Sequence, residues 1–135
     1  MSKTRAKILI IDDDPDFKKV LSIMLELDSY NVVTAKNPKD AKEKIFEVKP
    51  DLILLDIMMD SIFDGYSLCN EIKTSSEFQE FKETPIIFVS AMKDKAGTRA
   101  SFNTEEHGLV GPDDYIDKPV EKEDLLARIG KLLNR

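Results

Sequence analysis

Several residue types that would point to particular chemistry are scarce in this chain of 135 residues. There is one cysteine, Cys69, so an intramolecular disulfide cannot form. There is also one histidine, His107, and the chain therefore lacks the Cys/His cluster that a zinc site needs. The longest apolar runs, Ile8–Ile11 and Leu52–Leu55, hold four residues each. A membrane-spanning helix needs about 20.

Basic residues are outnumbered, since 20 Lys and Arg stand against 26 Asp and Glu and give a formal net charge of −6. Nonspecific binding to nucleic acid or to an anionic membrane is disfavoured, because both need a basic surface. The amino-terminal segment MSKTRAK is basic, but the apolar run after it is too short for a signal peptide. We therefore expect a cytoplasmic protein. The length suits one domain, and we expect residues 1–135 to form it without a separate output domain.

What the chain does contain is an alternation of strand-like and helix-like segments. Five segments are short and apolar, as expected for buried strands. They are Ile8–Ile11, Tyr30–Ala35, Leu52–Leu55, Ile86–Val89 and a short piece around Tyr115 and Ile116. Between and after them, apolar residues recur with the period of a helix. These stripes are Phe17, Val20, Leu21, Met24 and Leu25; Ala41, Ile45 and Val48; Tyr66, Leu68, Cys69 and Ile72; and Leu125, Leu126, Ile129, Leu132 and Leu133. The alternation predicts an α/β fold with a parallel sheet covered by helices on both faces.

The stretch Ala91–Pro112 is atypical, because it contains three glycines and its apolar residues share no helical face. We expect a short, displaced or irregular helix there, in one of the more mobile parts of the chain. The connection before Pro85 is also long.

Polar residues follow the predicted strands. In an open parallel sheet, ligands bind beyond the carboxyl ends of the strands. The residues found there are Asp12, Asp13 and Asp14 after the first strand, Asp56 after the third, Ser90 after the fourth and Lys118 after the fifth. Each has an ordinary explanation when taken singly, and Asp14 before Pro15 is expected to cap a helix. Together at one edge of a sheet they indicate a site.

The acidic residues of this set predict a metal ion. Two carboxylates about 4 Å apart repel by roughly 4 kcal/mol at an effective dielectric near 20. Asp12, Asp13 and Asp56 crowded together need a cation, and Lys118 supplies only one positive charge. A hard divalent ion, Mg²⁺ or in its place Mn²⁺, suits oxygen ligands.

Such an ion beside a lysine and a hydroxyl suits the handling of a phosphoryl group. The glycine-rich loops that bind nucleotides are absent from the sequence. A carboxylate can itself be the nucleophile and form an aspartyl phosphate.

Five segments in order, ILIIDDDPD, DLILLDIMM, Asp64-Gly65, PIIFVSA and DDYIDKP, strongly resemble the receiver domain of two-component response regulators. The resemblance runs from about Lys7 to the end of the chain. It implies the CheY-like, flavodoxin-like fold, a doubly wound parallel sheet of five strands in the order 2-1-3-4-5.

The resemblance also implies roles for single residues. Asp56 is the expected phosphoacceptor, and Ser90 and Lys118 are expected to contact the phosphoryl group. Ser90 and Tyr115 are the expected switch residues, and the Lys118–Pro119 peptide bond is expected to be cis.

For the metal, the resemblance implies Asp13 as a direct ligand and Asp12 as a ligand that acts largely through water. Asp56 and the backbone carbonyl of Met58 complete the expected ligand set.

The implied function is that of a signalling domain, which catalyses only its own phosphorylation and dephosphorylation and is not otherwise an enzyme. A sensor histidine kinase or a phosphotransfer protein is the expected donor, and a protein of unknown identity is the expected target. We expect a monomer or a weak homodimer, with no direct binding to DNA or membrane.

Two other hypotheses stay open. A Mg²⁺-dependent phosphohydrolase would use a nucleophile after the first strand, where Asp12 and Asp14 form an acidic pair. However, Pro15 stands where such enzymes usually have a polar residue, and Asp113-Asp114 precede Lys118 instead of following it. The other hypothesis is an inert interaction module, against which the complete acidic set argues.

Overall fold

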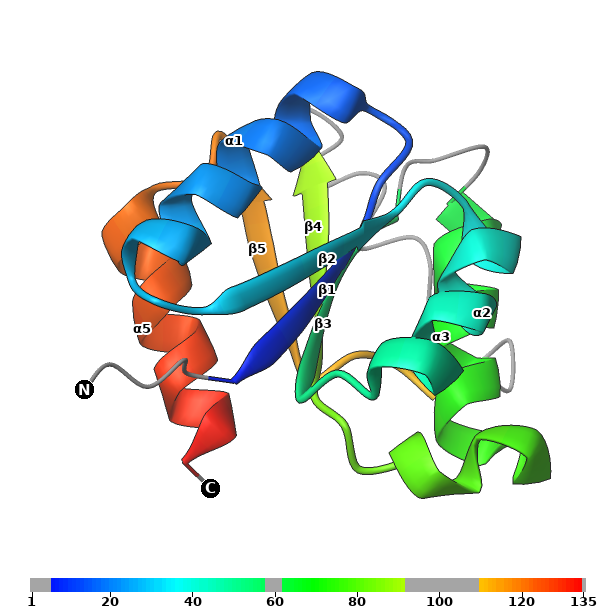
Figure 1. Cartoon of the computed structure of the whole chain (residues 1–135). Helices are drawn as coiled ribbons and strands as arrows, with labels where there is room; N and C mark the ends of the chain where they lie inside the picture. Colours follow the sequence, from blue (N-terminus) through cyan, green and yellow to red (C-terminus); the bar gives the residue numbers. More distant parts are fainter. Residues whose placement is uncertain (1–5, 58–61, 92–109, 135) are drawn as a thin grey trace.

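Five strands form one parallel sheet in the order β2-β1-β3-β4-β5 in the computed structural model, which describes residues 6–57, 62–91 and 110–134 (Figure 1). The strands are β1 (Lys7–Ile11), β2 (Asn31–Ala35), β3 (Leu52–Asp56), β4 (Ile86–Ala91) and β5 (Asp114–Lys118). All four pairings are parallel. The carboxyl ends of the strands therefore lie at one edge of the sheet, here called the carboxyl edge. The strand order expected from the resemblance is confirmed.

Helices cover both faces of this sheet, with α1 and α5 on one face and α2 and α3 on the other (Figure 1). They are α1 (Pro15–Leu27), α2 (Pro38–Val48), α3 (Ile62–Thr74) and α5 (Lys122–Leu133), together with the 3₁₀ helix η1 (Ser76–Phe81). Among the described residues, we find no helix that combines the length and the apolar character needed to cross a membrane.

Local sequence explains where α1 and α2 begin. The Asp14 side chain accepts hydrogen bonds from the backbone N–H groups of Asp16 and Phe17, at 3.0 and 3.4 Å. Asn37 caps α2 in the same way, and a proline follows each cap at the first helical position. The predicted capping role of Asp14 is confirmed.

The central strands are buried on both faces of the sheet, which is why their sequences are apolar without interruption. Along β3, Leu52 and Leu54 pack under α1 and α5, whereas Ile53 and Leu55 pack under α2 and α3. All four are at most 1% exposed. The two helical layers thus enclose separate hydrophobic cores.

The predicted helical stripes are mostly buried, and one position is wrong. The stripe of α3 is fully buried, as is the pair Leu21 and Leu25 of α1. Val20 is 47% exposed, because α1 turns the side of Leu21 and Leu25 toward the sheet. Val20 therefore does not belong to the core.

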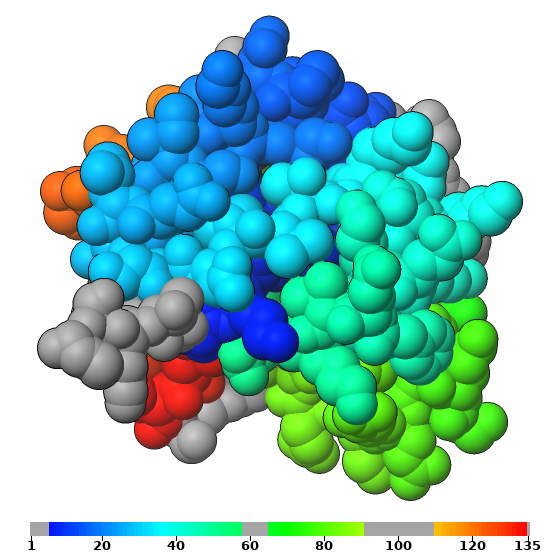
Figure 2. Space-filling view, in the orientation of Figure 1, coloured from blue at the N-terminus to red at the C-terminus, as the bar shows by residue number. Residues whose placement is uncertain are grey.

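The long connection before Pro85 folds as η1, which the sequence pattern did not predict. Phe78 and Phe81 of η1 are buried, and the ring of Phe78 stacks on Phe46 of α2 at a centroid distance of 5.0 Å. A salt bridge of 3.3 Å from Lys49 to Glu80 joins the end of α2 to η1. In the space-filling view, η1 forms the yellow-green base beside α2 (Figure 2). The connection therefore extends the core on the side of α2 and α3.

Strand β5 is anchored through the residue before it. The Lys73 ammonium of α3 lies 2.9 Å from Asp113 Oδ2, and the same oxygen accepts the backbone N–H of Ile86 at 2.8 Å. The segment Ala91–Pro112, expected to be irregular, falls mostly outside the described residues, so that expectation stays a prediction.

Candidate functional site

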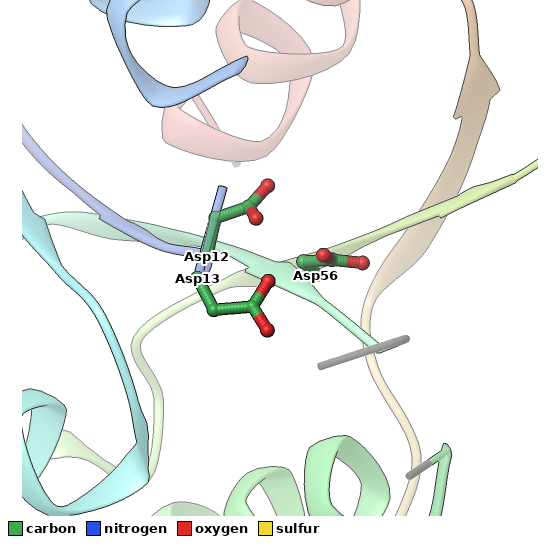
Figure 3. Close-up of side chains that lie close together, drawn as sticks. All are labelled: Asp12, Asp13 and Asp56. Carbon is green, nitrogen blue, oxygen red and sulfur yellow. The ribbon is translucent and has the colours of Figure 1, made fainter. Parts of the chain in front are cut away.

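Three carboxylates meet at the carboxyl edge (Figure 3). Asp12 and Asp13 directly follow β1, and Asp56 is the last residue of β3, the neighbouring strand. One carboxylate oxygen of each lies within 4.8 Å of the others. Asp12 and Asp56 are buried, with 1% and 4% exposed, whereas Asp13 is exposed. The sequence predicted this meeting of residues, because neighbouring parallel strands end at the same edge.

Crowding and burial change the protonation of Asp12. Burial, above all, raises its pKa from an ordinary 3.8 to about 7, and the charge of Asp56 and a hydrogen bond with that residue act in the same direction. The backbone N–H of Asp14, which donates to Asp12 Oδ1 at 2.9 Å, and the charge of Lys118 act in the opposite direction. Burial and the neighbouring carboxylate thus both disfavour the charged form of Asp12.

Lys118 is the cation that the sequence predicts at the carboxyl edge. Its Nζ lies 3.9 Å from Asp56 Oδ2 and 4.3 Å from the centre of the Phe17 ring in α1. The Lys118–Pro119 peptide bond is cis, as expected. One ammonium faces three carboxylates, and oxygen atoms are the ligands that hard divalent ions prefer. The three carboxylates fit a metal ion such as Mg²⁺.

The two expected switch residues, Ser90 and Tyr115, lie on β4 and β5. The Ser90 hydroxyl donates to Asp117 Oδ1 at 3.2 Å, and Ser90 is 6% exposed. The Tyr115 hydroxyl lies 3.1 Å from the hydroxyl of Tyr66, which is fully buried in α3. The Tyr115 ring also packs edge-on against Phe88, with centroids 5.7 Å apart.

Three of these partners were not singled out as site residues from the sequence. Phe17 and Tyr66 were taken only as parts of helical stripes, and Asp117 was not considered. Asp117 stands two residues after Tyr115, and the alternation along a strand places both side chains on one face of the sheet. This two-residue spacing is the sequence signal that could have identified Asp117 as a neighbour of the site. Met58, expected to offer a backbone carbonyl to the metal, lies outside the described residues.

Comparison with known proteins agrees with this geometry. The family model for the response regulator receiver domain matches residues 8–130. The chain belongs to the family of response regulator receiver domains.

Two curated relatives are longer than this chain. A probable transcriptional regulator ycf27 from Guillardia theta is 35% identical over 133 residues, which are 98% of this chain and 47% of that protein. The transcriptional regulatory protein ResD from Bacillus subtilis is 36% identical over 129 residues, which are 96% of this chain and 48% of ResD. The chain thus spans about half the length of the curated relatives it matches.

Solved structures show the same fold. A putative response regulator from Chloroflexus aurantiacus aligns with a TM-score of 0.78 at 28% identity, covering 98% of this chain and all of that one. The receiver domain of a signal transduction histidine kinase from Syntrophus aciditrophicus also aligns with a TM-score of 0.78 at 28% identity, covering 96% of this chain and 91% of that one.

Proposed function

We propose that residues 1–135 act as one phosphoacceptor receiver domain of a two-component phosphorelay, with Asp56 as the residue that is phosphorylated. The observation that carries this proposal is the meeting of Asp12, Asp13 and Asp56 within 4.8 Å at the carboxyl edge, with Lys118 3.9 Å from Asp56. Membership of the receiver family supports it.

In the proposed reaction, a carboxylate oxygen of Asp56 forms a bond to phosphorus. The bond from phosphorus to the donor, a histidine nitrogen or an acyl oxygen, breaks, and its electron pair leaves with the donor. Lys118, already beside Asp56, pairs with one phosphoryl oxygen, and Ser90 donates a hydrogen bond to another. Asp56 is the best placed nucleophile, because the only cation described at the cluster lies next to its carboxylate.

The proposed metal ion is Mg²⁺, for which Mn²⁺ can substitute. Its proposed ligands are Asp12, Asp13, Asp56 and the backbone carbonyl of Met58. When bound, the ion supplies positive charge that offsets the carboxylates and the incoming phosphoryl group. The protein's part is to bring the three carboxylates together at the ends of two neighbouring strands, where their oxygens lie within 4.8 Å of one another.

The proposed donor is a sensor histidine kinase or a phosphotransfer protein, and the proposed result is altered binding to a downstream protein through Ser90 and Tyr115. Relatives such as ResD are described as transcriptional regulators, and this chain spans about half of them. Because the chain has a net negative charge, we propose that it does not itself contact DNA or a membrane. We also propose that it acts in the cytoplasm, as a monomer or weak homodimer.

Labelling with radioactive acetyl phosphate tests the proposal. Wild type, Asp56→Asn and Asp14→Asn are incubated with the donor in Mg²⁺, in Mn²⁺ or in EDTA, and the labelled peptide is identified. We expect label on Asp56 only, its loss in Asp56→Asn and in EDTA, and near-normal labelling of Asp14→Asn. Asp14 is the matched control, because it is a neighbouring carboxylate whose described role is to cap α1.

Two results would contradict the proposal. Equal labelling of wild type and Asp56→Asn would show that Asp56 is not the acceptor. Label on Asp12 would favour the phosphohydrolase hypothesis, in which the nucleophile follows the first strand. For the metal, broadening of the Asp12, Asp13 and Asp56 amide resonances by Mn²⁺ is expected, and broadening elsewhere alone would contradict the ligand set.

A further inference from the structure

Ser90 and Asp117 form a cross-strand pair at the end of the sheet. They are register partners on the parallel strands β4 and β5, two residues beyond the pair Phe88 and Tyr115. Side chains of a strand alternate between faces, so both pairs lie on the face covered by α2 and α3. The contact in the Ser90 pair is a hydrogen bond of 3.2 Å from the buried serine hydroxyl to Asp117 Oδ1.

Asp117 does not belong to the carboxylate cluster. Lys118, the next residue, points to the opposite face of the sheet and reaches Asp56 and Phe17. Asp117 is itself exposed, whereas Ser90 is 6% exposed. Its described contact with the site therefore runs through the Ser90 hydroxyl.

A serine hydroxyl carries one proton and can donate one hydrogen bond. In the structure this proton is directed at Asp117. In the proposed function the same proton is donated to a phosphoryl oxygen. The two bonds exclude each other, so the bond to Asp117 must break before Ser90 can engage the phosphoryl group.

We propose that Asp117 is a positioning residue that holds Ser90 in the unphosphorylated protein and competes with the phosphoryl group for its hydroxyl. This inference rests on the proposed function. Through this hydrogen bond, Asp117 stabilises the state in which Ser90 faces it, and it therefore shifts the two-state equilibrium away from the phosphorylated arrangement. The carboxylate sets how strongly phosphorylation is coupled to movement of Ser90.

Binding of beryllofluoride, a stable mimic of a phosphoryl group on a carboxylate, measures this competition in the presence of Mg²⁺. We expect Asp117→Ala to bind the mimic about two- to tenfold more tightly than wild type, the range given by one hydrogen bond. Asp117→Asn keeps an acceptor oxygen without the charge, and its affinity should lie between the two. The amide resonance of Ser90 in free Asp117→Ala should also move toward its position in the wild-type complex.

A double-mutant cycle separates the hydrogen bond from simple removal of charge. In a Ser90→Ala background, Asp117→Ala should leave the affinity for beryllofluoride unchanged. Glu121→Ala is the matched control, because Glu121 is an exposed acidic residue close in sequence whose side chain makes no capping hydrogen bond to α5. It removes the same charge and should leave the affinity near that of wild type.

The proposal is overturned if Asp117→Ala binds the mimic no more tightly than wild type. It is also overturned if the gain persists in Ser90→Ala, or if Glu121→Ala gives an equal gain, since either result would assign the effect to charge. A wild-type chain that neither binds the mimic nor is labelled by acetyl phosphate would instead refute the proposed function. Thermal midpoints of all variants, measured alongside, show whether the fold itself is unaffected.

Discussion

The two faces of the sheet are packed with different kinds of side chain. Under α1 and α5 the buried residues are almost all aliphatic, so we call this the aliphatic face. Under α2, α3 and η1 lie Tyr66, Phe78, Phe81 and Phe88, so we call this the aromatic face. Both faces are buried, and they differ in the geometry that their side chains impose.

Aliphatic packing is non-directional, whereas aromatic rings and hydroxyl groups prefer defined orientations. On the aromatic face, Phe88 meets Tyr66 and Tyr115 edge-on, at centroid distances of 4.7 and 5.7 Å. The hydrogen bonds of Tyr115 and Ser90 lie on the same face. The aromatic face therefore also fixes the residues proposed to switch.

The largest effect should come from Phe88→Ala. Phe88 is fully buried, and truncation of a buried phenylalanine costs about 3–5 kcal/mol. Leu54→Ala is the matched change on the aliphatic face and should also destabilise, by about 2–5 kcal/mol. Urea unfolding measures both. Only Phe88→Ala should shift the ring resonances of Tyr115. An equal shift in Leu54→Ala would contradict the idea that the aromatic face alone orients Tyr115.

The carboxylate cluster lies at the carboxyl edge, and changes to it should act through charge. In EDTA, Asp12→Asn should raise stability by about 1–3 kcal/mol at pH 8, because a buried, repelled carboxylate is replaced by a neutral amide. Asp14→Ala should lower stability by about 0.5–2 kcal/mol, because it removes the cap of α1. The change in stability is thus expected to have opposite signs for Asp12→Asn and Asp14→Ala, although the two acidic residues are close in sequence.

The pH dependence has a definite sign. The pKa of Asp12 is about 7 in the folded protein and near 3.8 when unperturbed, so the folded state binds more protons between these values. Its contribution to stability is therefore lost as the pH rises from about 4 to about 7. Thermal midpoints in EDTA across this range should fall more for wild type than for Asp12→Asn. Parallel curves would contradict the assignment.

The sequence predicted most of the fold because its strongest signals are local. A strand buried on both faces is apolar throughout, and for that reason the run Leu52–Leu55 predicts β3. Parallel pairing then brings Asp12, Asp13 and Asp56 to one edge, which needs only the strand order. The carboxylate cluster could be predicted without any knowledge of contacts.

The contacts on the aromatic face could not be predicted in this way. The pair Ser90 and Asp117 depends on the register between β4 and β5, and the residues between these strands give no signal of register. Helix η1 is too short for a helical stripe, and its Phe78 is fixed by Phe46 of another helix. These features follow from tertiary packing, which pattern and spacing do not encode.

A smaller effect is expected from the two glycines that lie in helices on opposite faces. In α3, a Cβ on Gly65 would come within 2.8 Å of the Cα of Ile57, a backbone atom that cannot move aside. Gly65→Ala should therefore cost about 1–3 kcal/mol by overpacking. In α5, a Cβ on Gly130 meets nothing within 4 Å, and Gly130→Ala should stabilise by about 0.5–1 kcal/mol. Equal signs in urea unfolding would show that α3 is not held closely against the end of β3.

The smallest effect should come from the hydrogen bond between Tyr66 and Tyr115. Tyr66→Phe keeps the ring packed against Phe88 and removes only the oxygen, so a loss of about 0.5–1.5 kcal/mol is expected. Tyr66→Phe and Tyr115→Phe should be non-additive in a double-mutant cycle, because each substitution removes the same bond.

The control is Tyr30→Phe, a change in a buried tyrosine of the aliphatic face. It should be additive with Tyr115→Phe within about 0.5 kcal/mol. Coupling of Tyr115 to Tyr30 as strong as its coupling to Tyr66 would mean that the two faces do not act independently. Coupling confined to Tyr66 would mean that α3 and β5 are joined by a directional contact, through which a movement of Tyr115 reaches α3.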